Sequence, residues 1–183
     1  SIHESLFPSS ITEESFEFDF FFKPMRFMGG DFIHVSRASK TKVRILLLDV
    51  TGHGLAAAMT VTRLYGETER IVAERPTISP KDFMAILNRY VHLTLANHSI
   101  YATGIVAEID LQTGELCYAN AGHPPAFILN LGGKCERLPG TGIILGAVDS
   151  DGFLCEEHSQ TMTIGSHLMM YTDGAFETRV SDG

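Results

Sequence analysis

The stretch VRILLLDVTGHGLAAAMTVTRLYGETERIVAE, residues 43–74, decides the fold of this chain. It begins with aliphatic and β-branched residues over 43–49, which predict a buried strand that ends on Asp49. Two closely spaced glycines then interrupt the pattern. From 55 to 74 the composition changes to residues that favour helices. The stretch therefore predicts a strand, a tight turn and a long helix.

The segments on either side extend this pattern. Pro76 is expected to end the first helix, and Ser79-Pro80 is typical of the N-cap and first turn of a second helix that reaches about Asn97. Short strands are predicted for the other apolar or alternating segments, at 15–22, 31–37, 101–110, 115–120, 125–130 and 167–172. Strands, then two helices, then strands predict an α+β domain.

Composition narrows the classes of partner. The 183 residues suggest one domain, and 14 basic against 22 acidic residues argue against a nucleic-acid partner. The three cysteines, Cys117, Cys135 and Cys155, lack C-x-x-C spacing, which favours reduced thiols in a reducing compartment. The sequence shows neither a membrane-spanning apolar run nor a signal peptide. We therefore expect a cytoplasmic protein that binds neither nucleic acid nor membrane.

Three aspartates stand where a predicted strand meets a glycine, namely Asp31, Asp49 and Asp173. A strand end holds a carboxylate rigidly, and an adjacent glycine lets another group approach the backbone. Converging carboxylates repel one another unless a cation lies between them, and oxygen ligands favour Mg²⁺ or Mn²⁺. Aspartate beside glycine is also common in ordinary turns. From the residues alone, a divalent-metal site and three unrelated turns are equally open.

Two histidines are candidates for proton transfer. His53 and His123 lie in short loops that are rich in glycine or proline, and either could act as a proton donor. The chain has no G-x-S-x-G element and no Walker phosphate loop, so a serine hydrolase and a P-loop enzyme have little support.

Several blocks of the sequence, taken in order, resemble those of one family: the bacterial sporulation stage II protein E-type phosphatases, a branch of the metal-dependent protein phosphatase 2C superfamily. The resemblance covers about residues 15 to 183. The blocks are Gly29-Gly30-Asp31-Phe32, Leu48 through Gly54 with Ala56-Ala57-Ala58, Ala102 through Asp110, Tyr118 through Pro125, Thr141 through Gly146, and Tyr171 through Gly174 with Glu177.

The resemblance implies an α+β fold of four layers, an αββα sandwich in which two antiparallel sheets are flanked by helix pairs. It also implies two Mn²⁺ or Mg²⁺ ions between the sheets. By position, Asp49 would bridge both ions, the carbonyl of Val50 would complete one shell, and Asp173 and Asp31 would be further ligands. Asp49 is then the central catalytic residue, and His53 is the candidate that protonates the leaving oxygen.

The function that the resemblance implies is a metal-dependent hydrolase acting on phosphoserine or phosphothreonine of a partner protein, such as an anti-sigma-factor antagonist. Residues 1–183 are expected to form a single phosphatase domain, shortened at its C-terminus, that serves as the output domain of a longer regulator. An upstream sensor or receiver module would act through the helices of residues 55–98. A homodimer stays open.

Two departures from the family pattern support a different function. His34 stands at the last position of the usual G-G-D-x-x-D block, and the chain ends before a further aspartate that normally follows Asp173. The alternative is a catalytically degenerate phosphatase fold that serves as a binding or regulatory module. A nucleotide cyclase hairpin is disfavoured, because it needs an acidic residue where Phe32 stands.

Overall fold

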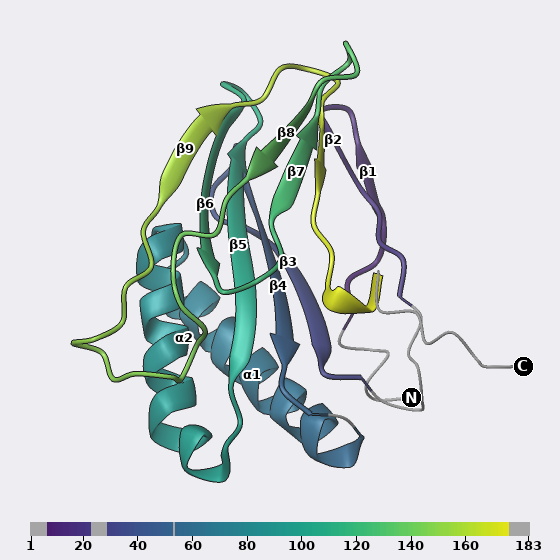
Figure 1. Ribbon diagram of the computed structural model, residues 1–183. Coiled ribbons are helices and arrows are strands. Elements are labelled where there is room, and N and C mark those ends of the chain that lie inside the picture. Colours follow the sequence, from purple (N-terminus) through teal and green to yellow (C-terminus); the bar gives the residue numbers. More distant parts are fainter. Residues whose placement is uncertain (1–6, 23–28, 53, 176–183) are drawn as a thin grey trace, which may run out of the picture.

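The computed structural model describes residues 7–22, 29–52 and 54–175 (Figure 1). The deciding stretch folds as predicted, into strand β4 (Lys42–Val50) and helix α1 (Leu55–Glu74). Helix α2 (Pro80–Thr94) begins at the predicted cap, where the Ser79 hydroxyl accepts a hydrogen bond from the Asp82 amide at 3.1 Å. It is shorter than expected, and a 3₁₀ turn, η2 (Ala96–His98), follows it.

The described strands form two larger antiparallel sheets and one hairpin. The large sheet has the order β3-β4-β5-β6-β9, with β3 (Asp31–Arg37), β5 (Ala102–Asp110), β6 (Glu115–Ala121) and β9 (His158–Thr161). The small sheet has the order β10-β7-β8, with β7 (Ala126–Leu129), β8 (Cys135–Leu138) and β10 (His167–Met169). Strands β1 (Ile11–Glu13) and β2 (Phe16–Phe18) pair only with each other among the described residues.

The large sheet is buried on both faces, and alternation along its strands assigns each side chain to one of them. One face packs against α1 and α2, and its core includes Leu46, Leu48 and Val106. The other face packs against the small sheet, with Leu47 and Ile105 in the same core as residues of β7 and β8. Figure 1 shows the resulting order of layers: helices, large sheet, small sheet.

Two of the predicted strands are shorter than expected. The strand expected over 15–22 is limited to β2, because the Asp19 carboxylate accepts the Phe20 amide at 2.9 Å and the Ser10 hydroxyl at 2.7 Å, which ends the pairing. The strand expected over 167–172 ends at Met169. Strands β1, β8 and β9 were missed because they are three or four residues long and largely polar.

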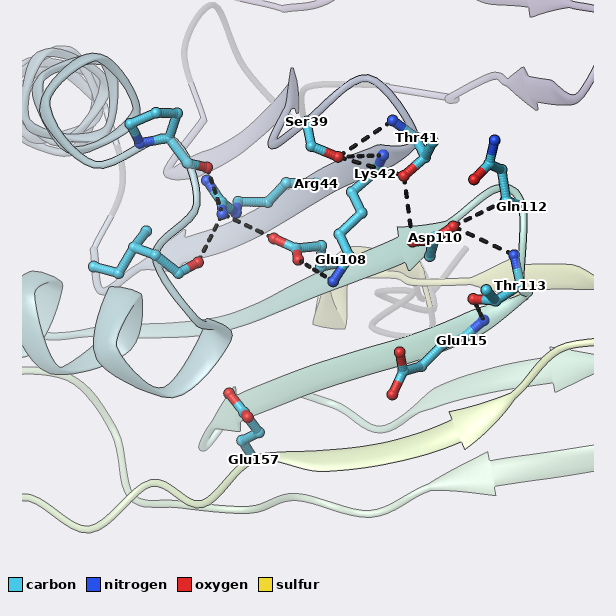
Figure 2. A network of polar contacts seen from close by, with 12 residues as sticks. Ser39, Thr41, Lys42, Arg44, Glu108, Asp110, Gln112, Thr113, Glu115 and Glu157 are labelled. Carbon is cyan, nitrogen blue, oxygen red and sulfur yellow. Dashed lines mark hydrogen bonds and ion pairs between the residues drawn. The ribbon is translucent and has the colours of Figure 1, made fainter.

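A buried ion pair joins the sheet to the connection between the helices (Figure 2). Arg44 is 1% exposed, and its Nη2 donates to the Glu108 carboxylate at 2.8 Å across the β4–β5 pair. The same nitrogen donates to the backbone carbonyls of Ile78 at 2.7 Å and Pro76 at 3.0 Å. These contacts stabilise the α1–α2 turn against the sheet.

No helix within the described residues is both long and apolar enough to cross a lipid bilayer.

Candidate metal and phosphate site

Polar side chains lie in a row at one end of the large sheet. Asp31 on β3 pairs with Asp49 on β4, and Asp49 pairs with Thr103 on β5. Directly paired residues point to the same face of a sheet. Because Leu47 and Ile105 are two residues away along β4 and β5, this is the face covered by the small sheet. The carboxylates of Asp31 and Asp49 therefore lie between the two sheets, as the resemblance implies.

The third aspartate reaches this row from the small sheet. The chain beyond β10, yellow in Figure 1, leads to the 3₁₀ turn η3 (Asp173–Ala175). The residue before it, Thr172, donates its hydroxyl to the Asp31 carboxylate at 3.1 Å. This contact joins residues that are 141 positions apart and brings Asp173 to the end of the large sheet.

Electrostatics show that the three carboxyl groups act on one another. Burial is the main cause that raises the pKa of Asp49 to about 7, and the charges of Asp31 and Asp173, together with hydrogen bonds between the carboxyl groups, add to it. Burial likewise raises the pKa of Asp31, against a lowering by the Thr172 hydroxyl. Without a nearby positive charge, the ionised form of Asp49 is therefore disfavoured.

The donor set suits a hard divalent cation. It consists of carboxylate oxygens, which Mg²⁺ and Mn²⁺ prefer, and a cation would offset the repulsion that raises the pKa of Asp49. Within the described ranges, no three acidic, histidine or cysteine side chains surround a common point closely enough to form a complete metal cage. The structure brings the predicted carboxylates together as hydrogen-bonded neighbours.

A glycine lets the backbone close up at this end of the sheet. A Cβ atom added to Gly30 would lie 2.5 Å from the Val50 carbonyl oxygen, which is too close for any side chain. The same two residues are joined by a hydrogen bond of 3.1 Å from the Val50 amide to the Gly30 carbonyl. The glycine before Asp31 therefore has the role that its sequence position suggests, since it admits the Val50 carbonyl beside the carboxylates.

His123 lies behind the site and is neutral. Burial lowers its pKa to about 4. Its Nε2 lies 3.0 Å from the Tyr171 carbonyl, which can only accept, so Nε2 carries the proton. Its Nδ1 then accepts from the Thr103 hydroxyl at 2.9 Å. A neutral imidazole with both nitrogens engaged is a poor proton donor to a substrate, which argues against that sequence-based role for His123.

The His34 side chain, which departs from the family pattern, lies away from the site. His34 lies three residues from Asp31 on a strand and therefore points to the opposite face, towards helix α1. There its Nε2 contacts the Glu69 carboxylate at 2.8 Å, and its ring packs edge-on against Tyr65. A side chain at this position cannot reach a metal between the sheets. The His34 substitution therefore gives the degenerate reading no support.

Some predicted residues lie outside the described part of the chain. These are His53 and Glu177, and the role expected for His53 stays a prediction. Conversely, sequence reasoning missed Thr103, Thr172 and Asn120 as parts of the site. Of these, only Thr172 stands directly beside a candidate residue in the sequence, Asp173, and that signal is weak.

Comparison with known proteins places the chain in a family. The family model described as "Stage II sporulation protein E (SpoIIE)" matches residues 39–183. The phosphoserine phosphatase RsbP of Bacillus subtilis (strain 168) is 27% identical over 183 residues, which are 98% of this chain and 44% of RsbP. This chain thus spans less than half the length of that relative.

Solved structures share the fold. The RsbU and RsbW domains of Rv1364c from Mycobacterium tuberculosis match with a TM-score of 0.70 and 26% identity, over 85% of this chain and 42% of theirs. RsbX in a complex with magnesium matches with a TM-score of 0.64 and 16% identity, over 91% and 72% of the two chains. These matches confirm the predicted protein phosphatase 2C-like α+β fold. Together with the family match over residues 39–183, they show that this chain belongs to the stage II sporulation protein E family of phosphatase domains.

Proposed function

We propose that this chain is a metal-dependent protein serine/threonine phosphatase domain. The observation that carries the proposal is the convergence of Asp31, Asp49 and Asp173 between the sheets, where burial, and after it the charges of the other two carboxylates, raises the pKa of Asp49 to about 7. A phosphate ester is itself an anion, so a site made of carboxylates can accept it only with cations present. The phosphoserine phosphatase activity in the name of the relative RsbP supports the same function.

The three aspartates would hold two Mg²⁺ or Mn²⁺ ions, with the Val50 carbonyl as a further oxygen ligand. Such ions supply Lewis-acid chemistry, polarising the phosphoryl oxygens and lowering the pKa of water. The chain's own contribution is to fix the Asp31 and Asp49 carboxylates on strand ends and to hold Asp31 with the Thr172 hydroxyl. The magnesium in the RsbX complex supports a divalent ion, and His53 stays the candidate for protonating the leaving oxygen.

We infer a phosphorylated antagonist of an anti-sigma factor as substrate, an upstream sensor or receiver module, and a cytoplasmic location for the longer regulator to which this single domain would belong. The length of RsbP, of which this chain spans 44%, supports an output domain. Exposed Leu129 and Met169 on the outer face of the small sheet support a further helical layer and hence the four-layer sandwich.

Hydrolysis of p-nitrophenyl phosphate and of a phosphoserine-bearing antagonist protein tests the proposal. We expect turnover with Mn²⁺ or Mg²⁺ and none with a chelator, since the carboxylates alone repel the substrate. For a substitution of Asp49 in the site, Asp110→Asn is the matched control. Asp110 also ends a strand, but its carboxylate accepts the Gln112 amide and caps the β5–β6 turn. Folded protein that neither binds Mn²⁺ nor turns over either substrate would leave the binding-module alternative.

Gly30→Ala tests the backbone geometry. The added methyl would lie 2.5 Å from the Val50 carbonyl and must displace it. We expect Mn²⁺ affinity to fall by about 10-fold or more, with a loss of stability of about 1–3 kcal/mol. Isothermal titration calorimetry and thermal melts measure the two effects.

Gly66→Ala is the control for that substitution, because nothing lies within 4 Å of the Cβ position in this helical glycine. It should stabilise the protein by about 0.5–1 kcal/mol and leave Mn²⁺ binding unchanged. Equal Mn²⁺ affinity in both variants would contradict a role for the Val50 carbonyl.

A further inference from the structure

A chain of hydrogen bonds runs behind the three aspartates. The Thr103 hydroxyl contacts His123 Nδ1 at 2.9 Å, and His123 Nε2 donates to the Tyr171 carbonyl at 3.0 Å. One residue further on, Thr172 donates to Asp31, and Asp173 follows. This series of hydrogen bonds therefore starts at Thr103, which pairs with Asp49, and ends next to Asp173.

His123 is itself held firmly. It is 5% exposed, and its backbone amide donates to the Asn120 side-chain oxygen at 2.8 Å. Asn120 is fully buried, and its side-chain nitrogen donates to the Pro124 carbonyl at 3.3 Å. The loop from Asn120 to Pro124 thus orients one imidazole, and each ring nitrogen has one partner. A buried polar arrangement with every group satisfied is rigid.

His123 joins the segment that leads to Asp173 to the large sheet. Strand β10 ends at Met169, so the ladder between the small-sheet strands stops before Tyr171. The Tyr171 carbonyl accepts a hydrogen bond from His123, which is anchored on the large sheet through Thr103. This link holds the Tyr171 carbonyl, two residues before Asp173, next to Thr103, the strand neighbour of Asp49.

We propose that His123 is a positioning residue that sets the place of the Asp173 carboxylate opposite Asp49, acting through the Tyr171 carbonyl. It touches neither substrate nor metal. Residues behind metal ligands commonly change metal affinity by about 10- to 100-fold when they are replaced. This inference rests on the proposed metal-dependent function and adds to it the element that aligns one ligand.

The test compares Mn²⁺ affinity among matched variants by isothermal titration calorimetry. His123→Phe fills the space without either hydrogen bond, and we expect its Mn²⁺ dissociation constant to rise by about 10- to 100-fold. His123→Gln keeps a donor for the Tyr171 carbonyl and should recover most of the affinity. His92→Phe is the control, because His92 also contacts a backbone carbonyl, that of Gly146 at 3.1 Å, but on helix α2 away from the site.

A second pair of variants serves if His123→Phe does not fold. Thr103→Val removes the hydroxyl that orients the ring while keeping the side-chain shape, and Thr103→Ser keeps the hydroxyl. We expect weakened Mn²⁺ binding in the valine variant and near-normal binding in the serine variant, at similar melting temperatures. A purely structural role would instead lower the melting temperature of His123→Phe and leave the Mn²⁺ affinity of its folded fraction unchanged.

Nuclear magnetic resonance of the metal-free protein adds a readout without metal or activity. Long-range ¹H–¹⁵N spectra at pH 7 should show His123 protonated on Nε2 alone, because the Tyr171 carbonyl requires a donor there. Protonation on Nδ1 would overturn the inference. Wild-type protein that binds no Mn²⁺ would contradict the proposed function as well, whereas tight wild-type binding that His123→Phe leaves unaltered would contradict the positioning role alone.

Discussion

Asp49→Asn is expected to abolish Mn²⁺-dependent phosphatase activity while stabilising the metal-free protein at pH 8. Activity should fall by at least about 1,000-fold, the upper range for loss of one group that acts on transition-state charge. Stability should rise by about 2 kcal/mol, because the variant removes a partly buried charge that two neighbouring carboxylates repel. Loss of activity with loss of stability would instead indicate a structural role for Asp49.

The pH dependence of that stabilisation follows from the sign of the pKa change. The pKa of Asp49 is about 7 in the folded protein and 3.8 in the reference state, so its protonation stabilises the fold. This stability is fully present below pH 4 and is lost as the pH rises through 7. The advantage of Asp49→Asn should therefore be largest above pH 7 and vanish near pH 4. Urea unfolding of the two metal-free proteins from pH 4 to 8 measures it.

His123 has the opposite pH dependence. Its pKa falls from 6.5 to about 4 on folding, so the neutral ring contributes stability above pH 6.5 that is lost as the pH falls towards 4. In wild-type protein, the effects of Asp49 and His123 oppose each other between pH 4 and 7. In Asp49→Asn only the histidine effect remains, and stability should decline steadily with acid. If the stability of Asp49→Asn did not change with pH over this range, the buried neutral state of His123 would be contradicted.

Glu108→Ala is expected to produce the largest loss of stability, about 3–5 kcal/mol, because it leaves Arg44 as a buried charge without a carboxylate. Glu136→Ala is the matched control, since its pair with Lys134 lies in solvent and should contribute less than about 1 kcal/mol. The double variant Arg44→Met with Glu108→Leu should recover much of the loss. Urea unfolding checks all three, and a change below about 1 kcal/mol in Glu108→Ala would contradict the argument.

Much of the fold follows from local patterns in the sequence. The run of aliphatic and β-branched residues over 43–49 predicted β4 within a residue at each end, and the helix-forming composition of 55–74 predicted α1. The Ser79-Pro80 cap predicted the start of α2, because capping is a local interaction between neighbouring residues. Short polar strands such as β9 carry no such signal, since edge pairing depends on the neighbouring strand rather than on their own composition.

The sequence by itself placed Asp31 and Asp49 at strand ends close to glycines, and its ordered blocks pointed to the family. Asp173 was expected to end a strand as well, but it lies in the 3₁₀ turn η3, because β10 ends at Met169. Only the tertiary structure decided that Asp31, Asp49 and Asp173 meet, because the contact between Thr172 and Asp31 joins two sheets across 141 residues. Only it decided that His34 faces the helices and that His123 is a buried neutral link. The physical reason is that residue spacing sets which face of a strand a side chain occupies, whereas sheet packing sets what that face meets.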